Sequence, residues 1–72
     1  MASEIDALSA LIRSYAKAAD MSDVELMGQI AEGIGLVGGP VAREFLIGQL
    51  EYVGGPELKG KLARALGLAT HR

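Results

Sequence analysis

Two copies of a Val-Gly-Gly-Pro motif, at 37–40 and 53–56, limit how this chain can fold. Glycine readily takes the left-handed conformation just past a helix C-terminus, and proline fits the first position of a helix. Each motif therefore predicts that one helix ends and the next begins within four residues. The offset of 16 residues between the motifs leaves room for a helix over about 40–53.

Apolar residues recur at intervals of three and four along the chain, and no segment shows the sustained two-residue alternation of a half-buried strand. Ser3 with Asp6 resembles a capping box, and Ser22 with Glu25 forms a complete one, so a helix is expected to follow each serine. We therefore expect an all-α fold, a compact bundle of four short helices in which the last three are stacked. The predicted helices cover 4–19, 23–37, 40–53 and 56–69.

The length and composition of the chain narrow the possible classes of protein. Its 72 residues are enough for a single helical domain, 1–72, and leave no room for a second. The absence of cysteine excludes disulfides and thiolate metal sites, and the net charge of −2 provides no basic surplus for nucleic acid. The acidic, polar N-terminus does not resemble a secretory signal, and charged residues interrupt every long apolar window. We expect a cytoplasmic protein that does not enter membranes.

The 16-residue offset extends beyond the two motifs. It also aligns three apolar positions of successive helices, Ile30, Leu46 and Leu62. One helix per 16 residues corresponds to a helix pair of about 32 residues, which is the size of known helical-pair repeats.

Segments 31–40, 45–50, 56–59 and 62–67 together resemble the short HEAT-like repeat of the phycobilisome-lyase type. The resemblance covers about residues 24–69 and implies that the last three helices stack in a HEAT-like manner. Such repeats bury their apolar faces against neighbouring repeats, and the chain holds fewer than two complete ones. The resemblance therefore implies that other copies of the chain, or a partner protein, supply the missing neighbours.

The predicted helix over 40–53 has a wider apolar arc than one core face requires. A helical wheel places Val41, Phe45 and Tyr52 on one sector, next to a second apolar sector. Two interpretations remain open. Either this is the central, most buried helix of the bundle, or the sector faces a second chain with Phe45 and Tyr52 as aromatic anchors.

The predicted helix over 23–37 carries two glycines, Gly28 and Gly35, which lie on the same side of it. Each costs about 1 kcal/mol of helix propensity relative to alanine. Either tertiary packing tolerates this loss, or the glycines permit a tight helix contact, which we expect to be between chains.

The C-terminal part of the sequence is locally basic, with Lys59, Lys61, Arg64 and Arg72 and no acidic residue from position 59 onward. Solvation and the negative end of the helix dipole account for such cations. They are also candidates for electrostatic docking to an acidic protein, to another copy or to nucleic acid. Nucleic-acid binding is the weaker interpretation, since no aromatic residue lies among these cations.

No constellation in the sequence predicts catalysis, a cofactor or a metal ion. The segment 33–38 matches G-x-G-x-x-G, but it closes a helical pattern where a dinucleotide site would need a strand before it and a helix after it. Asp20, Asp23 and Glu25 gather where acids cap a helix. His71 is the single histidine and has no second ligand of its kind.

The sequence therefore predicts a non-catalytic protein that acts by burying apolar helix faces between chains. Its expected partner is a second copy, in a homo-oligomer, or another protein. Two alternatives remain open: a membrane-active helical peptide resembling a bacteriocin, and a small regulator that docks to nucleic acid. The net charge of −2 argues against the first, because such peptides carry a cationic surface.

Overall fold

The computed structural model describes residues 4–70 and, from residue 7 onward, their side chains. Within 4–70 the chain forms four α-helices and no strand, so the predicted all-α bundle is confirmed. Each helix boundary lies within one residue of its predicted position. The helices are α1 Glu4–Asp20, α2 Val24–Val37, α3 Gly39–Tyr52 and α4 Pro56–Thr70.

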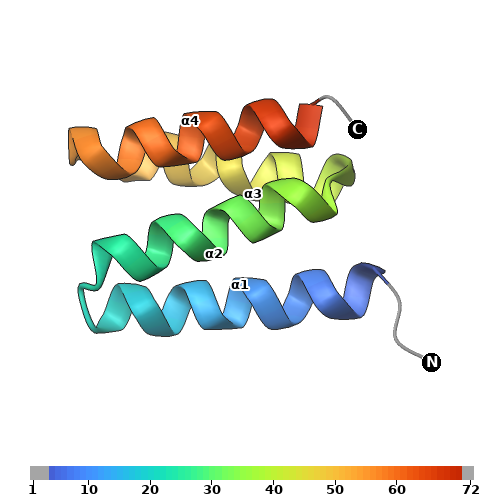
Figure 1. Ribbon diagram of the computed structural model, residues 1–72, viewed down its shortest axis with the longest axis horizontal. Helices are drawn as coiled ribbons and strands as arrows, with labels where there is room; N and C mark the ends of the chain where they lie inside the picture. The colour runs from blue at the N-terminus through green and yellow to red at the C-terminus, as the bar shows by residue number, and fades with distance from the viewer. Residues whose placement is uncertain (1–3, 71–72) are drawn as a thin grey trace.

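The helices form a flattened bundle. In Figure 1, α1, α2 and α4 follow one another from bottom to top, and α3 lies behind α2 and α4. Successive helices run in opposite directions, so one end of the bundle holds the C-termini of α1 and α3 together with the N-termini of α2 and α4. The radius of gyration is 11.1 Å, as expected for a compact chain of this length.

Helix α2 is the central element of the bundle. It packs against α4 on one side and α1 on the other, and it buries five residues where α3 buries only two, Ala42 and Leu46. Of the two interpretations of the third helix, the one that makes it the central, most buried helix is therefore wrong. Helix α3 packs mainly on α4, and its wide apolar arc is partly exposed instead of being surrounded. The largest fully buried side chains of the core are Ile34, Leu46 and Leu62.

The turn between α1 and α2 uses a different capping residue from the predicted one. Ser22 lies in the left-handed region at φ 56°, and Asp23 is the N-cap of α2, with its carboxylate accepting a 3.2 Å hydrogen bond from the backbone N–H of Leu26. The N–H groups of Ser22 and Asp23 donate to the carbonyls of Ala19 and Ala18, both at 3.0 Å. These two bonds form a Schellman motif that ends α1 and leaves Ser22 at the position that glycine normally occupies. The capping box predicted at Ser3 lies outside the described residues.

We expect Ser22→Gly to stabilise the protein by about 0.5–1 kcal/mol, because glycine adopts a positive φ without the steric cost of a Cβ atom. The free energy of unfolding from urea titrations monitored by circular dichroism measures the change. Ser14→Gly is the matched control, since Ser14 lies exposed within α1. This control is expected to lower stability by a similar amount. A loss of stability in both variants would contradict the strain assigned to Ser22.

The two Val-Gly-Gly-Pro motifs differ in conformation despite their identical sequence. In the first, Gly38 alone separates α2 from α3, and Gly38 and Gly39 have φ values of 74° and 88°. In the second, three residues from Val53 onward separate α3 from α4, and neither glycine has a positive φ. The sequence repeat therefore sets where the helices end but does not produce two equivalent turns.

Candidate functional site

A pocket of about 550 Å³ opens at the end of the bundle where α1 and α3 finish and α2 and α4 begin. We call it the end pocket. Its volume is within the range of about 300–1,000 Å³ that is typical of ligand sites. The lining residues come from all four helix ends and are Ala19, Ser22, Val24, Met27, Val53, Gly55, Pro56, Glu57 and Leu58.

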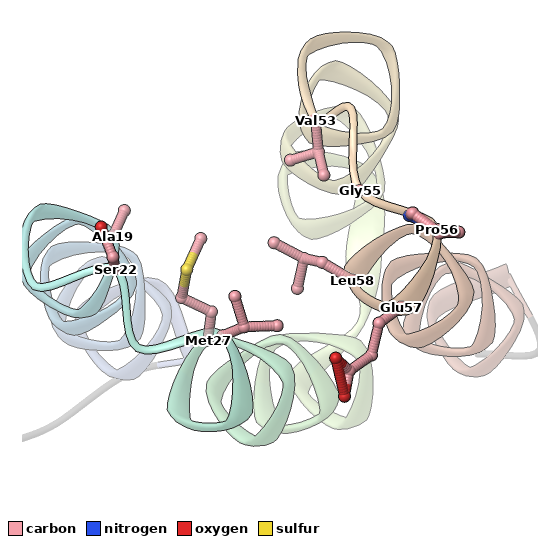
Figure 2. A pocket seen from close by; sticks show the side chains of 9 residues that line it. Ala19, Ser22, Met27, Val53, Gly55, Pro56, Glu57 and Leu58 are labelled. Atoms are coloured by element: carbon pink, nitrogen blue, oxygen red, sulfur yellow. The ribbon is translucent and has the colours of Figure 1, made fainter.

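The end pocket exists because α1 and α3 do not close over α2 and α4 at this end. Figure 2, a view along the helices, shows Met27 of α2 and Leu58 of α4 pointing into the space between α1 and α3. Val53, just after α3, points into the same space from the opposite side, and Ala19 lies on the wall formed by α1. The floor and walls are therefore made mainly of aliphatic and thioether groups.

Further along the bundle an aromatic pair joins α1 to α3. The rings of Tyr15 and Phe45 meet edge to face, with centroids 5.3 Å apart and an interplanar angle of 88°. Tyr15 is buried, at 3% exposure, and its burial raises the pKa of the hydroxyl above the ordinary value of 10.0. The hydroxyl oxygen has no hydrogen-bond partner among the described residues. This pair is a direct contact between α1 and α3.

The chemistry of the lining suits binding an apolar group. Only Ser22 and Glu57 contribute polar side chains, and Figure 2 shows the Glu57 carboxylate turned away from the centre of the pocket. In the part of the chain that the structure describes, no three His, Cys, Asp or Glu side chains gather as a metal site would require. None of the helices in this part is long and apolar enough to span a bilayer.

The three residues predicted as one interface sector on α3 have different surroundings. Val41 and Tyr52 are exposed, at 59% and 86%, whereas Phe45 is half-buried against Tyr15 of the same chain. Phe45 therefore already has an intramolecular partner, and its role as an anchor for a second chain stays a prediction. Tyr52 lies seven residues after Phe45, on the same side of α3, and immediately precedes Val53 of the end pocket.

The two glycines of α2 make a tight helix contact, but it lies within the chain. A Cβ atom at Gly35 would meet the backbone carbonyl oxygen of Ala65 in α4, and one at Gly28 would meet the side-chain stem of Lys61. Both glycines are buried. The expected contact between chains at Gly28 and Gly35 is therefore wrong, because α4 already covers this side of α2.

The predicted basic patch does not form a continuous stripe. Lys61 is half-buried because its stem crosses Gly28, while Lys59 and Arg64 are exposed. Glu32 of α2 lines the same small hollow as Lys61 and Arg64, so a carboxylate lies among the cations. Arg72 and His71 lie outside the described residues.

The acids and glycines of the remaining motifs have structural roles. The acidic cluster at the start of α2 is interpreted as capping residues, and Asp23 does cap this helix. Within the G-x-G-x-x-G match, only Gly38 ends a helix, whereas Gly33 and Gly35 lie inside α2 against Leu11 and α4.

The residues that line the end pocket were not predicted as site residues. Ala19, Met27 and Leu58 lie on the apolar faces that the periodicity assigns to the core, and the periodicity does not distinguish a covered apolar face from an open one. The sequence signal that could have located the pocket is the helix polarity. Four helices joined by short turns must bring residues 19–27 and 53–58 to the same end.

Comparison with protein-family models, with curated proteins and with solved structures yields no match to this chain. The HEAT-like resemblance stays a prediction.

Proposed function

We propose that this chain is a non-catalytic protein-interaction module that binds an apolar part of another polypeptide chain in its end pocket. The observation that carries the proposal is an open pocket with an apolar lining at the end of α3, where Tyr52, an aromatic side chain that is 86% exposed, immediately precedes the lining residue Val53. Met21, 60% exposed, lies in the turn at the same end of the bundle. Aromatic and methionine side chains beside an apolar depression are typical of protein interfaces.

The composition of the pocket favours binding over catalysis. General acid–base or nucleophilic chemistry needs at least two polar groups within hydrogen-bond reach of a bound substrate. The end pocket offers one serine hydroxyl and one carboxylate that points away from its centre. Burial of apolar surface is the interaction that these side chains can provide.

Photo-crosslinking of the full chain tests this function. Benzoylphenylalanine in place of Tyr52 is expected to give a discrete adduct with a protein of the source cells or, if the chain assembles with itself, with a second copy. Ala19→Trp fills the end pocket from an exposed position and is expected to abolish the adduct. Ala10→Trp is the matched control, since Ala10 is exposed on α1 and does not line the pocket.

Three results would contradict the proposal. The first is the absence of any protein adduct, and the second is an adduct that Ala19→Trp leaves intact. The third is release of dye from lipid vesicles at about the low micromolar concentrations of membrane-active helices, which would favour the bacteriocin-like alternative.

A further inference from the structure

We infer that the occupant of the end pocket is an amphipathic helix with basic flanks, supplied by another protein. This inference rests on the proposed function and adds the chemical class of the partner. It follows from the charges around the pocket, from the shape of the opening and from the position of Tyr52.

The negative charge of the chain is concentrated around the end pocket. The sequence positions that lie no more than two residues from a lining residue hold five acids and two lysines, a net charge of −3. The whole chain carries −2, so the rest of it carries the balance of +1. The acids are Asp20, Asp23, Glu25, Glu51 and Glu57, and the lysines are Lys17 and Lys59.

The helix dipoles do not change the sign of this charge. The opening lies between α1 and α3, and both helices end beside it, each with the partial negative charge of a helix C-terminus. The N-termini of α2 and α4 lie at the same end with the opposite partial charge, so the four dipoles largely cancel and the side-chain charges decide the sign. A cationic partner is therefore attracted to this end, whereas an anionic one is repelled.

A second copy of the chain is a poorer occupant by the same reasoning. A two-fold arrangement of pocket on pocket would bring together two ends that each carry −3, and such an interface must be self-complementary. Like charges that meet across an interface cost affinity and slow association.

The shape of the opening fits a helix. Helices α1 and α3 form its two walls and run in the same direction, and Met27 and Leu58 lie between them (Figure 2). In 4–70 there is no strand to which an extended peptide could add by backbone pairing. A helix satisfies its own backbone hydrogen bonds and can place side chains spaced by three and four residues into an apolar groove.

The length of the docked segment is limited by the Tyr15–Phe45 pair. The rings of Tyr15 and Phe45 meet between α1 and α3, and Tyr15 lies one turn before Ala19, so the inferred partner helix enters from the open end. Tyr52 follows on the same side of α3 as Phe45, where its exposed ring can contact the next turn of the partner. The basic side chains of the partner then meet the acids around the opening.

Binding of a synthetic helix tests the inference. The probe is a fluorescein-labelled 18-residue peptide of Leu, Ala and Lys with one leucine stripe and lysine flanks. The comparison peptide has Glu for each Lys. Fluorescence anisotropy with the full chain is expected to show saturable 1:1 binding of the lysine peptide, at least tenfold tighter than that of the glutamate peptide, and weaker binding as salt is raised.

Methyl-labelled methionine locates the binding. The chain has three methionines, of which Met27 lines the end pocket, and Met27→Leu assigns its methyl signal as the one that disappears. The Met27 methyl resonance is expected to shift with the same saturation curve as the anisotropy. A saturating anisotropy without a shift of Met27 would place the peptide elsewhere and overturn the inference.

Charge reversal at the pocket provides the matched comparison. Asp20→Lys with Glu57→Lys is expected to weaken binding of the lysine peptide at least tenfold. Glu32→Lys with Glu44→Lys changes the net charge equally at exposed positions that do not line the pocket, and is expected to change binding less than threefold. Equal effects of the two double variants would mean that only net charge attracts the peptide, which overturns the inference.

The results distinguish failure of the inference from failure of the proposed function. In one outcome neither peptide binds, or both bind equally, but Ala19→Trp still abolishes the crosslink at position 52. The protein-interaction function then holds, and the inference that the partner is a basic amphipathic helix is wrong. If that crosslink proves to be a dimer of this chain and the Met27 signal shifts on dilution, the occupant is a second copy. If peptide and crosslink both fail, the function itself is wrong.

Discussion

Replacing Gly35 with alanine is expected to destabilise the protein by about 2–3 kcal/mol, as overpacked substitutions in a tight interior do. A Cβ atom there would meet the carbonyl oxygen of Ala65 and lie 3.0 Å from its carbonyl carbon. These are backbone atoms of α4, so the collision is relieved only if α2 and α4 move apart along their shared interface. The loss is a large fraction of the stability of a chain this size, which is on the order of 5 kcal/mol. Urea denaturation followed by circular dichroism measures it.

Gly28→Ala is the matched control for this prediction. A Cβ atom at position 28 would meet only the flexible stem of Lys61, which can take another rotamer. The gain of about 1 kcal/mol in helix propensity offsets that adjustment, so the net change is expected to stay within about 1 kcal/mol. Equal destabilisation by both substitutions would show that the close approach of α4 to Gly35 is not the cause.

Replacing Tyr15 with phenylalanine is expected to stabilise the protein by about 1–2 kcal/mol. The hydroxyl of Tyr15 is buried without a hydrogen-bond partner among the described residues, and such a group costs about 1–3 kcal/mol of desolvation. The phenylalanine ring keeps the edge-to-face contact with Phe45. Tyr52→Phe is the control, since its side chain is 86% exposed, and it is expected to leave the free energy of unfolding unchanged. A Tyr15→Phe variant less stable than the wild type would show that the hydroxyl is satisfied.

The stability difference between Tyr15→Phe and the wild type is expected to grow in alkali. Burial raises the pKa of Tyr15 in the folded protein, whereas the unfolded chain releases this proton near pH 10.0. Above pH 10 the unfolded state therefore binds fewer protons than the folded state, and the stability of the wild type falls as pH rises. Urea titrations at pH 8, 10 and 11 measure the difference, and a constant value across this range would contradict the assignment.

The helix boundaries could be predicted from the sequence because they depend on local chemistry. Gly38 marks the end of a helix because glycine readily takes a positive φ. Pro56 marks the beginning of a helix because proline lacks an N–H. The capping residue of α2 was misjudged by one position. Ser22 and Asp23 are both good caps, and the choice depends on the backbone bonds that close α1, which place Ser22 in the left-handed region.

The roles of single residues on the helix faces could be predicted less well. The glycines at 28 and 35 leave a close helix approach as one of two interpretations, and the wheel does not reveal whether the neighbour belongs to the same chain. A helical wheel likewise does not distinguish Phe45 from Tyr52. In the structure the Phe45 ring packs on Tyr15, whereas the Tyr52 ring is exposed. Which helices pack against each other decides whether a residue on a helix face is covered, and in this bundle α2 is the central helix.

The sequence by itself determined the number of helices, their ends and their antiparallel succession, because propensity, capping and short turns act over a few residues. Only the tertiary structure decided where the apolar surface stays open. The gap between α1 and α3 above Met27 and Leu58 results from how all four helices pack, with α4 drawn close to α2 at Gly35. An apolar residue obeys the same periodicity whether a neighbour covers it or not, so the end pocket is a property of the packed bundle.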